Sequence, residues 1–130
     1  MTNALTDAQK RLYARQVLVA ELGTDGQARL CNAHVALEGD QRAARVALDY
    51  LARAGVAASR LAVDGSASIA LGSSEAVHAT AGDDALIECA AWLRGAFAAV
   101  EAIKQVAGIG TPRTLDPQLV LSEVRWRALP

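Results

Sequence analysis

The chain has 130 residues and a formal net charge of −1, with 52% hydrophobic and 4% aromatic residues. This length suits one domain, residues 1–130, but it is short for a complete dinucleotide-binding fold. The near-neutral charge excludes the basic surface that nucleic-acid binding requires. Because nothing resembles a signal peptide or a membrane-spanning segment, we expect a cytoplasmic protein that binds neither nucleic acid nor membrane.

Alanine makes up roughly a fifth of the chain, well above its usual share. Alanine side chains bury little area each, so we expect a thin core that a partner surface would complement. The two cysteines, Cys31 and Cys89, are predicted to be buried helix residues, and neither has a metal-ligand set nearby. Two unpaired thiols fit a reducing compartment.

Two short helices are expected to open the chain. Thr6 and Thr24 are each followed three residues later by a glutamine, which is the spacing of a capping box. This spacing predicts helices at about residues 7–16 and 25–32.

A strand-helix-strand unit follows the two helices. Residues 34–38 are predicted to form a short buried strand and residues 41–54 a helix that ends at Gly55. Residues 60–64 are predicted to form the next strand. Further short strands are expected at 67–71 and 76–80, so a parallel or mixed sheet is the natural product.

A long helix is predicted from Asp84 to the residue before Gly108, with Asp83 and Asp84 as its N-terminal cap. Apolar residues recur in it at helical spacing and predict its buried face: Leu86, Cys89, Leu93, Phe97, Val100, Ile103 and Ala107. Residues 119–127 alternate partly in polarity, which predicts a last strand at a sheet edge.

Gly39 lies at the turn between the first predicted strand and its helix, where a G-x-G-x-x-G phosphate loop would begin. The later glycine positions hold Gln41 and Ala44, and Arg42 adds bulk between them. Asp40 places a carboxylate where a phosphate would need to lie. The loop is therefore degenerate.

Several segments together resemble the ThiF/MoeB family of adenylating enzymes, which activate ubiquitin-like and sulfur-carrier proteins. The segments are similar to the family forms R-Y-x-R-Q, E-x-G-x-x-G-Q, L-x-x-x-x-V and G-x-x-x-x-x-E-A-I-K followed by G-I-G. They lie at residues 11–17, 21–27, 30–35, 95–104 and 108–110, with further matches at 50–56 and 60–64. The resemblance implies a reduced Rossmann-like α/β sheet with flanking helices, an N-terminal helical segment and a dimer.

The long middle stretch of a full family member is missing, because only residues 65–84 lie between the second strand and the late helix. In this chain, residues 65–84 contain no N-x-x-R, no lysine and no C-x-x-C zinc pair. Lys10 and Lys104 are the only lysines in the chain, so no central lysine can stabilise phosphate charge. The sequence thus resembles a truncated family member.

The resemblance implies three vestigial nucleotide-contacting residues. Arg15 matches the arginine that reaches across the family's dimer to the partner's ATP phosphates, and Arg11 shares this argument more weakly. Asp64 lies near the spacing at which an acidic residue holds a ribose, and Gly39 is the remnant of the phosphate loop. An interface salt bridge is the alternative role for Arg15.

Other polar residues have structural alternatives. His34 and His78 have no recognisable catalytic partner and are expected to be edge or loop histidines. Glu101 and Lys104 are expected to form a surface pair. Some family members use a cysteine as a thioester or persulfide acceptor, which is the alternative for Cys89.

Three functions remain open on this sequence. The first is a catalytically inactive ThiF-like subunit, without a cofactor or metal, that dimerises with itself or with a full-length family member and positions that partner or a carrier protein. The second is a minimal adenylyltransferase that binds ATP through Gly39, Asp64 and Arg15 in trans. The third is a small-molecule-binding α/β module that recognises a different ligand.

Overall fold

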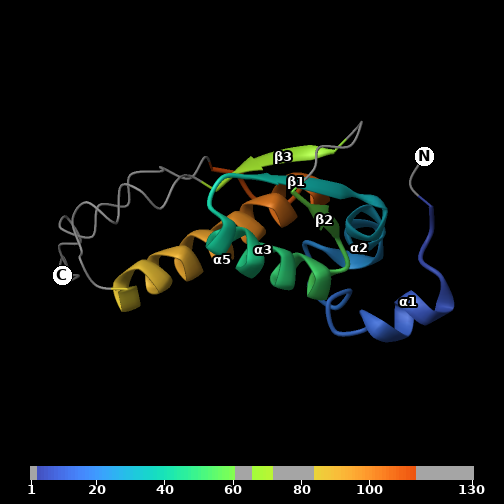
Figure 1. The fold of residues 1–130 in the computed structure, drawn as a ribbon. Helices are drawn as coiled ribbons and strands as arrows, with labels where there is room; N and C mark the ends of the chain where they lie inside the picture. Colours follow the sequence, from blue (N-terminus) through green and yellow to red (C-terminus); the bar gives the residue numbers. More distant parts are fainter. Residues whose placement is uncertain (1–2, 61–65, 72–83, 114–130) are drawn as a thin grey trace, which may run out of the picture.

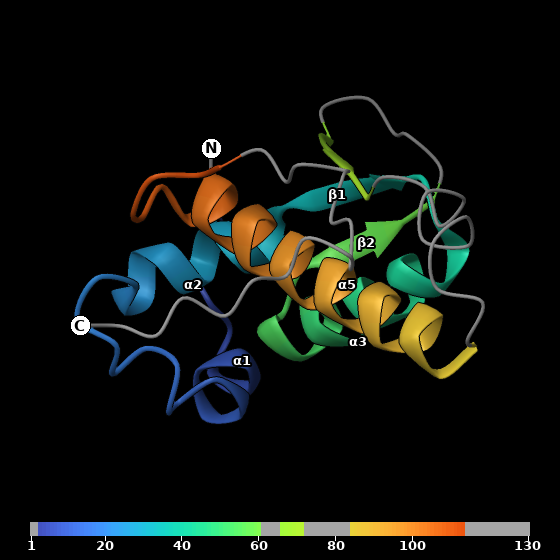
Figure 2. The same cartoon turned by 90° about the vertical axis from the view of Figure 1, so that its left-hand side faces the viewer.

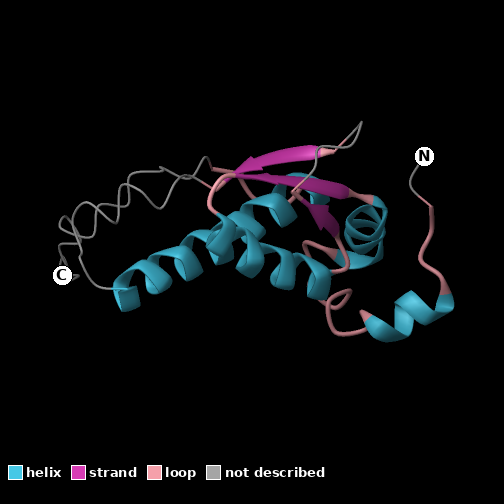
Figure 3. Ribbon diagram, in the orientation of Figure 1, coloured by secondary structure: helices cyan, strands magenta, loops and turns pink. Residues whose placement is uncertain are grey.

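A parallel three-stranded sheet forms the upper layer of the molecule in Figure 1. The computed structural model describes residues 3–60, 66–71 and 84–113. Its strands are β1 (His34–Glu38), β2 (Ala57–Ser59) and β3 (Ala67–Ala70), in the spatial order β2-β1-β3. Both neighbours run parallel to β1, so the described part is a mixed α/β structure (Figure 3).

The central strand β1 is the most buried of the three. Val35, Ala36 and Leu37 are almost fully enclosed, as expected for a continuous apolar run in a parallel sheet. His34 pairs with Ala57 on one side, and Leu37 with Ile69 on the other. Because all three strands are parallel, the residues that follow them lie at one edge of the sheet.

Two helices, α3 (Gln41–Ala54) and α5 (Asp84–Ala107), pack directly against each other below the sheet (Figure 1). A Cβ atom added at Gly95 of α5 would lie 2.4 Å from the carbonyl oxygen of Ala43 and 2.6 Å from Cβ of Val46. The helices therefore approach so closely that only glycine fits at this contact. Figure 2 shows α5 crossing in front of α3.

The core is built mainly from alanine, as its composition predicts. Most buried hydrophobic residues in the described part are alanines, and the largest enclosed apolar side chains are Leu30, Leu37, Leu51, Leu71 and Val35. Such a core contributes less burial energy for its length than one rich in leucine and phenylalanine.

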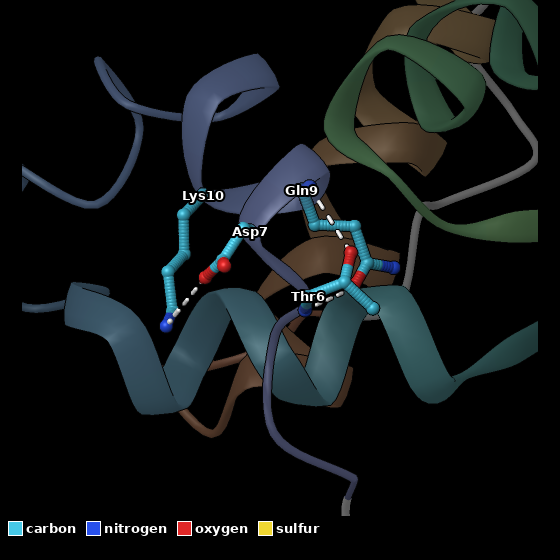
Figure 4. Close-up of polar contacts among 4 residues, drawn as sticks. All are labelled: Thr6, Asp7, Gln9 and Lys10. Carbon is cyan, nitrogen blue, oxygen red and sulfur yellow. Dashed lines mark hydrogen bonds and ion pairs between the residues drawn. The ribbon is translucent and has the colours of Figure 1, made fainter.

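Two shorter helices, α1 (Asp7–Leu12) and α2 (Gly23–Asn32), precede the sheet. The predicted capping box at Thr6 is confirmed: its hydroxyl accepts from the Gln9 N–H, and the Gln9 side chain accepts from the Thr6 N–H (Figure 4). Lys10 bonds Asp7 on the exposed face of the same helix (Figure 4). The helix ends at Leu12, four residues earlier than predicted.

The second capping box is wrong. Helix α2 begins at Gly23 rather than near residue 25, and its N-cap, Leu22, makes no side-chain capping bond. Gln27, the expected partner of Thr24, is instead fully buried. The side-chain amide of Gln27 donates to the carbonyl of Ala54 on α3. This buried hydrogen bond outweighs the local preference for a capping box.

The strands agree with the predicted positions in part. Strand β1, helix α3 and its end at Gly55 are confirmed, as are a strand within residues 67–71 and the end of α5 before Gly108. Strand β2 lies at Ala57–Ser59, ahead of the predicted 60–64. Residues 61–65, the strand expected at 76–80 and the edge strand expected at 119–127 lie outside the described residues.

The predicted buried face of α5 is wrong at its centre. Leu93, Phe97 and Val100 are exposed, as is Cys89. Apart from Ile87 and Arg94, the buried residues of the helix are small, and they include Ala90, Ala91, Ala98, Ala99, Ala102 and Ala107. Because α3 lies so close, only small side chains fit between the helices, and the larger apolar side chains turn outward.

None of the helices in the described ranges is long and apolar enough to cross a membrane.

Candidate functional site

The turn between β1 and α3 requires the glycine that begins it. Gly39 has φ of 121°, a conformation that residues with a side chain rarely adopt. Its carbonyl oxygen accepts a hydrogen bond of 3.1 Å from the Arg60 guanidinium, which follows β2. Gly39 thus lies at the predicted strand-to-helix turn, and its backbone is held by the neighbouring strand's connection.

Asp40 caps helix α3. One carboxylate oxygen, Oδ1, accepts from the backbone N–H of Arg42 at 3.1 Å. The other, Oδ2, lies 4.0 Å from Nη1 of Arg94 on α5, and both side chains are only 6% exposed. A buried carboxylate therefore occupies the N-terminal end of α3 and faces a buried guanidinium.

This arrangement fills the place in which an anion would bind. The free N–H groups and the dipole of a helix N-terminus favour a phosphate there, and a side-chain carboxylate meets the same preference. A phosphate would have to displace Asp40 and take over its contact with Arg94. Displacing Asp40 would also remove the carboxylate that caps α3, so the native turn disfavours a phosphate ligand.

Arg15 lies far from Gly39 within one chain. Its neighbour Gln16 donates to the carbonyl of Arg53 at 3.1 Å, which places this segment at the C-terminal end of α3. A helix of 14 residues spans about 21 Å, and Gly39 lies at the other end. The exposed Arg15 makes no hydrogen bond or ion pair with the described residues, and Asp64 lies outside them.

Helix α2 holds the C-terminal ends of both α3 and α5. The buried Gln27 amide donates to the carbonyl of Ala54 at 2.9 Å. Arg29 donates to the carbonyl of Ala107 through Nε at 3.0 Å and Nη2 at 2.6 Å. These contacts satisfy carbonyl groups that helix ends leave unpaired, and a cation at this end also complements the helix dipole.

The turn after α3 is packed against the N-terminal segment. Gly55 has φ of 92°, and a Cβ atom there would lie 2.9 Å from Cζ of Tyr13 and 3.1 Å from Sγ of Cys31. Burial raises the pKa of the Tyr13 phenol above its ordinary value, and a charge on Cys31 would raise it further. Tyr13 and Cys31 therefore act as packing residues around a glycine turn.

His34 lies in the central strand rather than at an edge. Its Nε2 lies 3.2 Å from the hydroxyl of Ser59 on β2, and its buried Nδ1 has no hydrogen-bond partner in the described ranges. Cys31 is half-buried, and Cys89 is exposed, so the predicted burial of Cys89 is wrong. His78 lies outside the described residues.

The outer side of the α3–α5 pair carries a shallow hollow of about 300 Å³. Trp92 forms one wall, and its ring meets that of Tyr50 edge to face at a centroid distance of 6.5 Å. The other lining residues are Arg42, Arg45, Val46, Asp49 and Glu88. Arg42 is bound to Glu88 at 3.2 Å, so part of the lining charge is already neutralised.

The predicted pair of Glu101 and Lys104 is confirmed at 2.7 Å. The second carboxylate oxygen of Glu101 accepts from the backbone N–H of Arg113, which returns the chain toward α5 after Gly108 and Gly110. The hydrogen bond from Lys104 lowers the pKa of Glu101 below its ordinary value of 4.5, and the bond from Arg113 lowers it further.

No group of three or more histidine, cysteine, aspartate or glutamate residues in residues 3–60, 66–71 and 84–113 is arranged to hold a metal ion. No protein-family model, curated protein or solved structure matches the chain.

Proposed function

We propose that the chain is a catalytically inactive, ThiF-like subunit that acts as a dimerisation or scaffold partner. The partner would be a second copy, a complete adenylating enzyme, or a ubiquitin-like or sulfur-carrier protein. The observation that carries the proposal is Asp40, because this carboxylate fills the helix N-terminus at which a nucleotide phosphate would bind.

The strand order supports the proposal, because it places Gly39 at a position of the sheet at which ligands usually bind. In open parallel sheets, ligands bind beyond the carboxyl ends of the strands, where successive connections lead to opposite sides of one strand. Here β2 and β3 flank β1, so Gly39 lies at such a point. The Rossmann-like frame is part of the proposal, and its ligand crevice is replaced by internal contacts of Asp40, Arg60 and Arg94.

Isothermal titration with ATP and magnesium tests this function directly. We expect no measurable heat from the native protein. The matched variant replaces Asp40 with alanine and Gln41, Arg42 and Ala44 with glycine, which removes the carboxylate and leaves Arg94 as a cation near the helix end. Asp49→Ala, on the exposed side of the same helix, is the control. Tight ATP binding by the native protein would contradict the proposal.

Arg15 can act only in trans under this proposal, because it lies at the far end of α3 from its own Gly39. If the chain pairs with a complete family member, Arg15 would stabilise phosphate charge in that partner's site. Pyrophosphate exchange by the partner should then fall by about 10³-fold with Arg15→Ala. Equal rates with a persistent dimer would leave Arg15 as an interface residue.

The hollow beside Trp92 favours a second candidate, a small-molecule-binding module. Its volume of about 300 Å³ is at the lower limit of ligand pockets, and an aromatic wall next to Arg45 suits a planar anion. The same titration with a panel of aromatic carboxylates distinguishes this function from the scaffold role. The minimal adenylyltransferase would instead require ATP binding through Gly39, Asp64 and Arg15 in trans.

A further inference from the structure

The hollow on the outer side of α3 and α5 has two apolar lining residues, one from each helix. Val46 of α3 is only 9% exposed, whereas Trp92 of α5 is 54% exposed. The close contact of the helices at Gly95, one turn after Trp92, brings the two side chains to the same hollow, because a Cβ atom at Gly95 would lie 2.6 Å from Cβ of Val46. A flat apolar group that enters the hollow can therefore leave water and contact both side chains.

The ring of Trp92 has a neighbour that limits its motion. Tyr50 of α3 meets it edge to face, at a centroid distance of 6.5 Å. Such a contact favours one orientation of the indole and leaves much of its surface open to a ligand. An aromatic surface that is already oriented loses less conformational entropy on binding than a mobile side chain. The hollow therefore suits a ligand with a flat ring.

The charged side chains of the lining are paired, except for Arg45. Arg42 bonds Glu88 at 3.2 Å. Asp49 bonds Arg53 at 3.0 Å, one turn further along α3. The exposed Arg45 makes no ion pair or hydrogen bond with any residue that the structure describes. Asp49 lies four positions after Arg45, at the spacing of a helical ion pair, but its carboxylate is bound to Arg53 instead.

These charges determine which ionic group the hollow can accept. The guanidinium of Arg45 offers a planar pair of N–H donors, which matches a carboxylate. Asp49 and Glu88 also line the hollow, so a second negative charge on the ligand would face a carboxylate. The volume of about 300 Å³ is at the lower limit for ligand pockets, which favours one ring or two fused rings over a larger molecule.

We propose that the hollow binds small planar aromatic monocarboxylates, with the ring against Trp92 and the carboxylate on the guanidinium of Arg45. This inference rests on the small-molecule function given above as the second candidate. It adds the residue that binds the anion and the preference for a single negative charge. Because the hollow is shallow, the dissociation constant of a one-ring acid should be on the order of 1 mM.

Benzoate is the probe, and the signal of the Trp92 indole N–H in NMR spectra of the full chain is the readout. The chain has two tryptophans, so Trp126→Phe identifies the Trp92 signal. We expect a saturable shift with benzoate. Three matched compounds should each bind at least about 5-fold more weakly: benzamide lacks the charge, cyclohexanecarboxylate lacks the flat ring, and benzene-1,3-dicarboxylate carries a second charge. Equal affinity of benzoate and any one of them would overturn the corresponding part of the proposal.

Substitution of Arg45 tests the residue that binds the anion. Arg45→Gln should weaken benzoate binding by about 10-fold, because the ligand loses a charge-assisted hydrogen bond. Arg45→Lys should recover part of this loss, since lysine keeps the charge but not the planar pair of donors. Arg11→Gln is the control, because Arg11 is an exposed arginine of α1 that does not line the hollow. An equal affinity of the Arg45→Gln and Arg11→Gln variants would overturn the role of Arg45.

The pair of Asp49 and Arg53 allows a test with effects of opposite sign. Arg53→Gln releases Asp49 to pair with Arg45, so benzoate should bind about 2-fold more weakly although Arg53 does not line the hollow. Asp49→Asn removes this competitor and should strengthen binding by about 2-fold, also in the Arg53→Gln background. A stronger binding of benzoate to Arg53→Gln would contradict the competition between Asp49 and the ligand.

The outcomes separate this inference from the functions proposed above. If benzoate and benzamide bind equally and Arg45→Gln changes neither, the hollow keeps its small-molecule function and only the ligand class is overturned. If no compound shifts the Trp92 signal, the inference and the small-molecule function are both overturned. The titration with ATP and magnesium tests the inactive subunit independently, because its site at Asp40 does not line the hollow.

Discussion

The two ends of the helical layer are built in different ways. At the N-terminal end of α3, the chain uses its own Asp40 and Arg94 where a nucleotide loop would leave space for a ligand. At the opposite end, Gln27 and Arg29 of α2 bind the last carbonyl groups of α3 and α5. Gln27 and Arg29 thus join helices to one another, whereas Asp40 occupies the helix end at which an anion would bind.

The strongest test of this comparison is the helix contact that places Arg94 near Asp40. Gly95→Ala should destabilise the protein by about 3 kcal/mol, since its new Cβ would collide with the backbone of Ala43 and push the helices apart. Chemical denaturation measures the change in the free energy of unfolding. Gly26→Ala is the control, because the added Cβ there meets only the flexible side chain of Leu22. Similar losses for both variants would contradict the close contact.

At the opposite end, Gln27→Ala should cost about 2 kcal/mol. The substitution leaves the carbonyl of Ala54 without its amide donor and removes a fully buried side chain. Gln16→Ala removes a comparable bond to Arg53 near the surface and should cost clearly less. The same denaturation experiment compares them, and equal costs would show that burial of Gln27 contributes nothing.

At the N-terminal end, Asp40→Asn should cost about 1 kcal/mol or less, because an asparagine still caps the helix but no longer balances the charge of Arg94. Asp40→Ala loses both and should cost about 2 kcal/mol. Thermal unfolding of the two variants separates the cap from the charge. If Asn and Ala were equally destabilising, the charge rather than the cap would be the larger contribution.

The smallest effect is expected at Glu101. The folded protein lowers the pKa of this carboxyl, so the ionised form is favoured by folding. Its contribution to stability is present above the ordinary value of 4.5 and is lost as the pH falls through the lower folded value. Unfolding measured from neutral pH to about pH 3 should show a weaker acid dependence in Glu101→Gln. Unchanged acid dependence would contradict the lowered pKa.

The sequence predicts best the elements that end at a capping residue or a glycine. Thr6 with Gln9, the strand before Gly39, and Gly55 and Gly108 after their helices are all confirmed. The buried face of α5 was predicted wrongly, because apolar spacing alone places Leu93 and Phe97 in the core. Their exposure depends on the distance to α3, which Gly95 sets, and a single sequence does not give this distance.

In the candidate site, too, contacts between residues adjacent in the chain are predictable, and contacts between distant residues are not. The position of Gly39 and the obstruction by Asp40 are readable from the sequence, because both depend on residues adjacent in the chain. The contribution of Arg94 is not, since it reaches Asp40 from a helix 54 positions later in the chain. Gln27 ends the segment at residues 21–27 that the sequence analysis singled out, but its acceptor on α3 required the fold. Arg29 lies outside that segment, and its contact with α5 also required the fold.

The bond between Arg29 and Ala107 has a consequence for how the chain folds. It joins residues 78 positions apart, and the central strand likewise pairs with two strands that are made after it. During synthesis, α2 therefore emerges long before the helix end that it binds, and β1 before either neighbour. Such non-local, parallel pairings close late and slowly. We expect this small domain to complete its folding only after residue 107 has left the ribosome, with its apolar segments exposed until then.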